Sequence, residues 1–172
     1  MTIKATTKKA TAPAAASDAI KLLTDDHKEV HALFQKYKKL LGKDESGTLR
    51  RPLAEQICVL LTVHAAIEEE IFYPAARKAG VDAALLDEAE VEHASCKDLI
   101  AQIRDMGADE ECYDAKVTVL GEYIAHHVKE EQDELFAKCR TSAMDLVAIG
   151  KRLVARKEML MAEMAEGLEA VH

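Results

Sequence analysis

Two pairs of histidine and glutamate stand where the surrounding sequence pattern calls for apolar residues. His64 and Glu68 are four residues apart, as are His127 and Glu131, so in a helix each pair shares one face. That face is otherwise apolar in both segments, and a charge buried there costs free energy unless a partner satisfies it. Imidazole and carboxylate groups gathered together are typical ligands of metal ions. The two pairs therefore predict a buried metal site.

The segments that carry these pairs also repeat each other. At an offset of 63 residues, HAAIEEEIFYP from His64 matches HVKEEQDELFA from His127. One further histidine precedes each segment, His27 in DDHKEVHALF and His93 in VEHASCKDLI, and these two are 66 residues apart. Each half of the chain thus offers a single histidine followed by an HxxxE pair. The predicted metal ligands are His27, His64, Glu68, His93, His127 and Glu131.

Two nearby histidines offer alternative ligands. His126 forms a second HxxxE pair with Glu130, but at 100° per residue this pair falls on a more polar side of the helix than His127 does. We therefore favour His127. His31 follows His27 by one turn and sits at the edge of the apolar stripe, so we keep it as a reserve ligand.

The elements that must position these residues are helices. Apolar residues recur at helical spacing in four long segments separated by short polar loops, which predicts an all-α, up-down-up-down four-helix bundle over residues 18–139. Pro74 should bend or end the second helix. Residues 140–172 are expected to add a C-terminal helix that packs on the bundle, and residues 1–17 a flexible tail. The predicted bundle helices cover about 18–42, 49–80, 81–107 and 109–138.

Composition narrows the function classes. The chain has 172 residues, of which 49% are hydrophobic and 31% charged, as in a globular domain. Its net charge of −8 should repel nucleic acid, and no apolar run is long enough for a membrane span. We expect a monomer or homodimer in the cytoplasm, since there is no secretory signal and free thiols suit a reducing compartment. The widely spaced cysteines are Cys58, Cys96, Cys112 and Cys139.

The segments DDHKEVHALF, HAAIEEEIFYP, EHASCKDLI and HHVKEEQDELF together resemble the hemerythrin-like, or HHE cation-binding, family over about residues 18–139. The resemblance implies a bundle that holds two iron ions, bridged by two carboxylates and an oxo or hydroxo group, and that binds dioxygen or related small molecules. The six residues named above would be the ligands, with Glu68 and Glu131 as bridges. Manganese shares these ligand preferences and is the alternative metal. No cofactor beyond the metal is expected.

Two positions depart from the oxygen-carrying members of the family. Those proteins have a second histidine where this chain has Lys97, and an aspartate where it has Gln132. Either His31 replaces the missing nitrogen ligand, or the centre has fewer histidines and another open position on the metal, which favours reactivity over reversible oxygen carriage. The leading hypothesis is a di-iron protein that binds dioxygen, nitric oxide or peroxide for sensing, storage, delivery or detoxification. The alternatives are a peroxidase-like or oxidase-like enzyme and a metal-independent helical interaction module.

Overall fold

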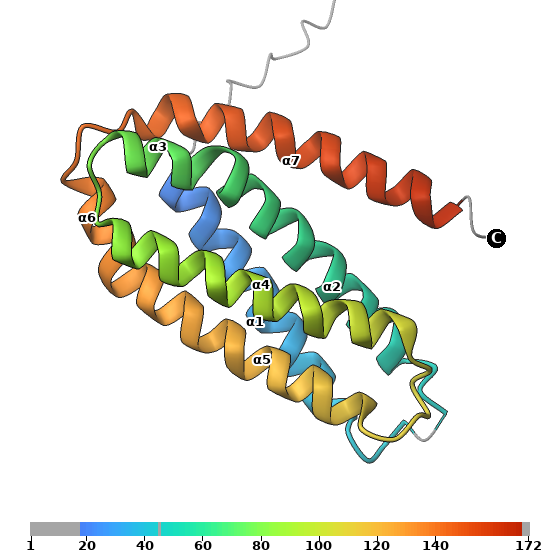
Figure 1. The fold of residues 1–172 in the computed structure, drawn as a ribbon. Helices are drawn as coiled ribbons and strands as arrows, with labels where there is room; N and C mark the ends of the chain where they lie inside the picture. The colour runs from blue at the N-terminus through green and yellow to red at the C-terminus, as the bar shows by residue number, and fades with distance from the viewer. Residues whose placement is uncertain (1–17, 45, 170–172) are drawn as a thin grey trace, which may run out of the picture.

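The computed structural model describes residues 18–44 and 46–169, and all regular elements within these ranges are helical (Figure 1). The tail expected at residues 1–17 lies outside the described residues. Four parallel and antiparallel rods form a bundle, and one long helix is added to it, so the predicted fold class is confirmed. The first two rods are α1 (Ala19–Leu40) and the continuous run of α2 (Arg50–Ile67), η1 (Glu68–Phe72) and α3 (Tyr73–Lys78). The others are α4 (Ala83–Asp105) and the run of α5 (Tyr113–Glu130), η2 (Glu131–Leu135) and α6 (Phe136–Arg140), followed by the added helix α7 (Leu146–Glu169).

The rods stand at the corners of a square. Helix α1 packs against α2 and α5, and α4 packs against the same two helices (Figure 1). The two rods that carry HxxxE pairs therefore lie diagonally opposite each other, and so do the two rods that carry single histidines. Side chains at the same height on the four inner faces must meet on the bundle axis.

Two rods contain a π-helical turn that apolar periodicity did not predict. Element η1 begins at Glu68 and η2 begins at Glu131, which are equivalent positions of the 63-residue repeat. The amide N–H of Tyr73 bonds to the carbonyl of Glu68 five residues earlier, and that of Phe136 bonds in the same way to Glu131. Such turns insert one extra residue into a helix and occur frequently at functional sites.

Helix ends follow from local chemistry. The carboxylate of Asp18 accepts a hydrogen bond from the Lys21 amide at 2.8 Å and so caps α1, and Asp82 caps α4 in the same way. Gly80 ends α3 with φ of +75°, a conformation that glycine adopts without strain. The rod continues four residues beyond Pro74, because this proline lies in the first turn of α3, directly after the π-helical turn, where its missing N–H leaves no α-helical bond broken.

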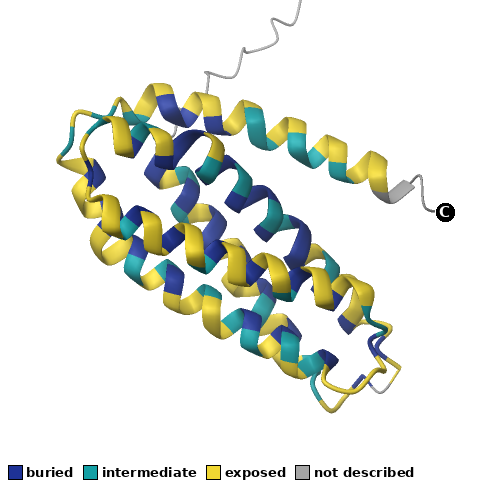
Figure 2. Cartoon of the chain, in the orientation of Figure 1, coloured by how far each residue is buried: buried dark blue, intermediate teal, exposed yellow. Residues whose placement is uncertain are grey.

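The buried interior is apolar at both ends of the bundle and polar between them. One apolar cluster surrounds Leu23, Phe72 and Leu153 near α3 and α7, and the other surrounds Ile57 and Leu120 toward the opposite end. Buried residues follow the inner faces of the rods, while much of α7 is exposed (Figure 2). Among the described residues, no helix combines the length and apolar character needed to cross a membrane.

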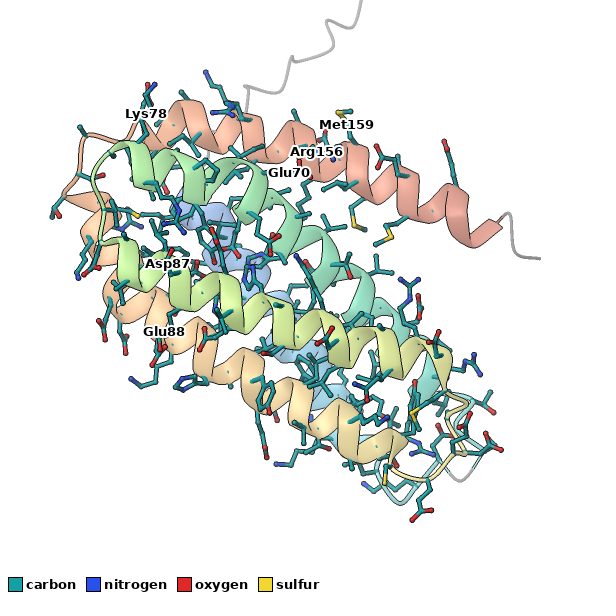
Figure 3. All side chains as sticks on the ribbon, in the orientation of Figure 1. Glu70, Lys78, Asp87, Glu88, Arg156 and Met159 are labelled. Atoms are coloured by element: carbon teal, nitrogen blue, oxygen red, sulfur yellow. The ribbon has the colours of Figure 1, made fainter. Side chains whose placement is uncertain are left out.

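Helix α7 covers one side of the bundle, in contact with α1, α2 and η1. Its Ile149 and Leu153 are buried in the first apolar cluster. Farther along, the Arg156 guanidinium donates two hydrogen bonds to the Glu70 carboxylate of η1, at 2.7 and 3.1 Å (Figure 3). The added helix is therefore joined to the bundle by both apolar and ionic contacts.

Candidate metal centre

The structure brings the six predicted ligands together between the two apolar clusters. All six side chains are buried, and Glu68 is completely inaccessible. Each rod contributes at least one of them: α1 and α4 supply one histidine each, and the two other rods supply an HxxxE pair each. The periodicity argument also separated two neighbours correctly, since His127 faces the interior while the His126 side chain is 63% exposed.

The ligand atoms form two adjoining groups. His27, His64, Glu68 and Glu131 offer atoms within 4.8 Å of one another, and Glu68 belongs also to a second group with His93 and His127. Oε2 of Glu68 lies 3.2 Å from Nε2 of His64 and 3.4 Å from Nε2 of His93. Oε2 of Glu131 in turn lies 3.2 Å from Nε2 of His27 and 3.8 Å from Nε2 of His127. Both carboxylates thus lie between imidazoles of the two groups.

Two buried carboxylate oxygens in this centre lack hydrogen bonds. Oε1 of Glu68 and Oε2 of Glu131 have no hydrogen-bond partner among the described residues. Leaving a buried charged acceptor unsatisfied costs several kcal/mol, as an order of magnitude. A cation bound between the glutamates would satisfy both atoms, so the residues present fit a metal ion.

All four imidazoles are oriented in the same way. Each turns Nε2 toward the centre and places Nδ1 beside a polar side chain on its outer side. A partner that accepts the Nδ1 proton leaves the Nε2 lone pair free to bind a metal. Three carboxylates can accept in this way, Asp26 beside His64 (3.4 Å), Glu69 beside His93 (3.0 Å) and Glu92 beside His127 (2.7 Å). The fourth partner differs, because the amide nitrogen of Gln132 lies 3.0 Å from Nδ1 of His27 and donates to it.

These outer partners follow the internal repeat, although the sequence reasoning did not identify them. Asp26 and Glu92 directly precede the single histidines His27 and His93, and each orients the histidine of an HxxxE pair. Glu69 and Gln132 directly follow the two glutamates, and each orients a single histidine. The sequence does contain a signal for these partners, because a polar residue stands at the equivalent position in both halves of the repeat.

Neighbouring carboxylates raise the pKa of two of the buried histidines, His64 and His127. Burial disfavours the charged form of His64, but the neighbouring Glu68 outweighs it and raises the pKa of His64 to about 10. Burial acts on Glu68 in the opposite direction, yet His64 keeps the pKa of Glu68 well below its usual range. His127 is also buried, and its hydrogen bond with Glu92 still raises its pKa. Protons and metal ions therefore compete for the same lone pairs.

Tyr73 adds a hydroxyl to the centre. The tyrosine is fully buried, and its oxygen lies 3.4 Å from Nε2 of His93, 3.4 Å from Oε2 of Glu68 and 3.2 Å from Oε1 of Glu131. Burial and the two carboxylates raise its pKa well above 10, so the phenol stays protonated and can donate. The equivalent residue of the repeat is Phe136, which stacks on His27 at 5.9 Å between ring centroids.

Two other residues that the sequence singled out lie away from the ligand atoms. The reserve ligand His31 is exposed and belongs to neither group of the buried centre. Lys97 places its ammonium 2.7 and 2.6 Å from the two carboxylate oxygens of Glu69, the outer partner of His93. It therefore acts on the centre through Glu69, and α4 supplies a single imidazole.

A small cavity of about 20 Å³ adjoins the centre. The four histidines line it together with apolar side chains that include Val30, Leu61 and Ile100. A larger groove of about 270 Å³, between α1 and α5, shares His27, Ile124 and Val128 with the cavity. A space of the smaller size holds one water-sized molecule, and the shared residues place the groove beside it.

The fold and the buried histidine–glutamate set define a helical bundle of the cation-binding type. The chain belongs to the hemerythrin family, because the Hemerythrin HHE cation binding domain matches residues 18–139. Its fold is similar to the crystal structure of a hemerythrin HHE cation binding domain-containing protein from Mycobacterium kansasii, with a TM-score of 0.75 and 20% sequence identity. The match covers 89% of this chain and 93% of the other. No curated protein matches the sequence significantly.

Proposed function

We propose that this protein binds two iron ions in the buried centre and uses them to bind or turn over a small molecule, either dioxygen, nitric oxide or peroxide. The observation that carries the proposal is the pair of ligand groups that share Glu68, with Glu131 placed between them. One ion would leave part of this set unsatisfied, whereas two ions can use all six residues. Imidazole and carboxylate ligands without thiolate suit iron, with manganese as the second choice.

The residues of such a site would have different roles as metal ligands, as partners that orient the ligands and as a proton donor. His27 and His64 would bind one ion and His93 and His127 the other, with the two glutamates as bridges. Bound iron would supply redox chemistry and an exchangeable coordination position. The four outer partners hold the imidazole rings in place, and the apolar cavity wall limits the access of water. Tyr73 can donate its proton to an oxygen atom beside Glu131.

One observation favours turnover over reversible carriage. Lys97 pairs with Glu69, so α4 would give only His93 to a bound metal, and one coordination position would stay open. A cavity that admits only a very small molecule fits peroxide as well as dioxygen. Peroxidase-like or oxidase-like activity is therefore the second candidate function.

All four cysteines, each within the described residues, are free thiols, which supports a reducing compartment such as the cytoplasm.

Metal content and the absorption spectrum test the proposal directly. Protein expressed with iron and purified in air should contain about two irons per chain, with a spectrum that changes on reduction and on addition of nitric oxide. Glu68→Gln and Glu131→Gln should each lower the iron content to about one per chain or less. The matched control is Glu134→Gln, which alters an exposed glutamate of the same rod as Glu131 and should keep the full content.

Two results would overturn this function. Protein that contains no metal, or a single zinc, would show that the buried set has another purpose. A chelated form as stable as the loaded form would favour a metal-independent interaction module, because a bound metal must stabilise the fold by linkage.

A further inference from the structure

A second cluster of possible metal ligands lies on the surface between α4 and α5. Glu92, His126 and Glu130 offer ligand atoms within 4.8 Å of one another. Nε2 of His126 lies 3.5 Å from Oε1 of Glu92 and 3.3 Å from Oε1 of Glu130. A hollow of about 360 Å³, lined also by Ser95 and Tyr123, opens on Glu92 and His126. The cluster is therefore accessible to ions and water.

Glu92 connects this cluster to the buried centre. Its Oε2 atom lies 2.7 Å from Nδ1 of His127, while its Oε1 atom faces His126. One carboxylate group thus separates the surface cluster from an imidazole of the centre.

The two other carboxylates that contact histidines of the centre, Asp26 and Glu69, each pair with a lysine, and Glu92 does not. Asp26 pairs with the ammonium of Lys157 at 2.5 Å, and Glu69 pairs with that of Lys97 at 2.6 Å. An ammonium carries its charge throughout the neutral pH range. The corresponding partner of Glu92 is the imidazole of His126, whose ring nitrogen is a group that can bind a metal ion. Glu130 adds a second carboxylate beside His126.

We propose that Glu92, His126 and Glu130 form a second metal site, which takes a divalent cation of the zinc type. One imidazole nitrogen and two carboxylate oxygens are ligands that zinc accepts, with water completing the coordination. The bound ion supplies the positive charge that lysines supply to Asp26 and Glu69. It also draws electron density from Glu92, which weakens the hydrogen bond that Glu92 accepts from His127. The surface ion thereby adjusts the strength of His127 as a ligand.

Calorimetric titration of iron-loaded, desalted protein with zinc chloride tests this site. We expect one zinc to bind per chain in addition to the iron, and binding at least about tenfold weaker in His126→Gln and in Glu130→Gln. These side chains are 63% and 37% exposed, so the substitutions leave the core packing intact. The matched controls are His31→Gln and Glu134→Gln, which alter exposed residues of the same types outside the cluster and should bind zinc like the unaltered protein.

A second readout separates this site from the buried centre. Zinc should shift the absorption bands of the iron-loaded protein, and His126→Gln should remove the shift. If iron does not load, the titration is repeated on chelator-treated protein, where zinc in the buried centre depends on Glu68 and zinc at the surface depends on His126. Absence of zinc binding to the loaded protein, or equal binding by the cluster variants and the controls, would overturn the surface site.

Discussion

The hydroxyl of Tyr73 lies 3.2 Å from Oε1 of Glu131, a residue of the diagonally opposite rod and of the other half of the repeat. The same hydroxyl lies 3.4 Å from Glu68 of its own rod. Phe136, the counterpart of Tyr73, has no hydroxyl and stacks on His27 instead. The centre is therefore asymmetric, with a proton donor on one side and an apolar ring on the other.

Removal of this hydroxyl should affect chemistry more than assembly. In Tyr73→Phe we expect the iron content to persist, the free energy of unfolding to fall by about 1 kcal/mol, and peroxide turnover to slow by about tenfold or more. The control is Tyr123→Phe, since Tyr123 is 49% exposed. Metal analysis, denaturant unfolding and steady-state assays measure the three quantities. Equal turnover by both variants would contradict a proton-donating role for Tyr73.

Metal should stabilise the fold most strongly at alkaline pH. The pKa of His64 rises from 6.5 to about 10 in the fold, so its proton stabilises the metal-free protein fully below pH 6.5. That stabilisation is lost as the pH rises through about 10, whereas bound metal replaces the proton and the loaded protein is spared this loss. The difference in Tm between loaded and chelated protein should widen across this range. In His64→Gln the widening should shrink, and an unchanged widening would assign it to other groups.

Helix α7 should influence the metal centre through Lys157. Its ammonium lies 2.5 Å from Oδ1 of Asp26, whose Oδ2 lies 3.4 Å from Nδ1 of His64. In Lys157→Met we expect iron to dissociate to a competing chelator up to about tenfold more readily, because the orientation of His64 is less restrained. Lys151→Met, on an exposed position of the same helix, is the control. Identical iron retention in the two variants would show that Asp26 orients His64 without help from α7.

Access of small molecules should depend on Ile124, which lines both the cavity and the groove. The larger ring in Ile124→Phe occupies space at this junction, so nitric oxide should bind several-fold more slowly while the iron content is retained. Ile124→Leu conserves the side-chain volume and should keep the original rate. Stopped-flow absorption on the loaded proteins measures both rates. Unchanged binding in Ile124→Phe would place the route elsewhere.

The fold class and the identity of the inward-facing residues were predictable because both rest on periodicity. A histidine or glutamate in an apolar stripe is forced inward by its neighbours, and the repeat placed His64 and His127 at equivalent positions. The same argument predicted that His126 faces outward, and its side chain is 63% exposed in the structure. The structure brings the six residues together, and their role as ligands stays a prediction.

Other parts of the site were hidden from this reasoning. Asp26 and Glu69 look like residues of a solvated helix face, and only the tertiary arrangement places them beside His64 and His93. Tyr73 follows Glu68 by five residues, a spacing at which an α-helix would not return the side chain to the same face. The π-helical turn brings it back, and apolar periodicity averages over such a local change.

The matched π-helical turns make the length of two short segments more important than most of their side chains. Each turn contains one residue more than an α-helical turn, so loss of one residue from Glu68–Phe72 or Glu131–Leu135 would rotate everything downstream by about 100°. Replacement of exposed Asp133 changes only the surface, whereas deletion there would carry Phe136 away from His27. Both halves of the 63-residue repeat must therefore keep the same number of residues at this point for the centre to stay assembled.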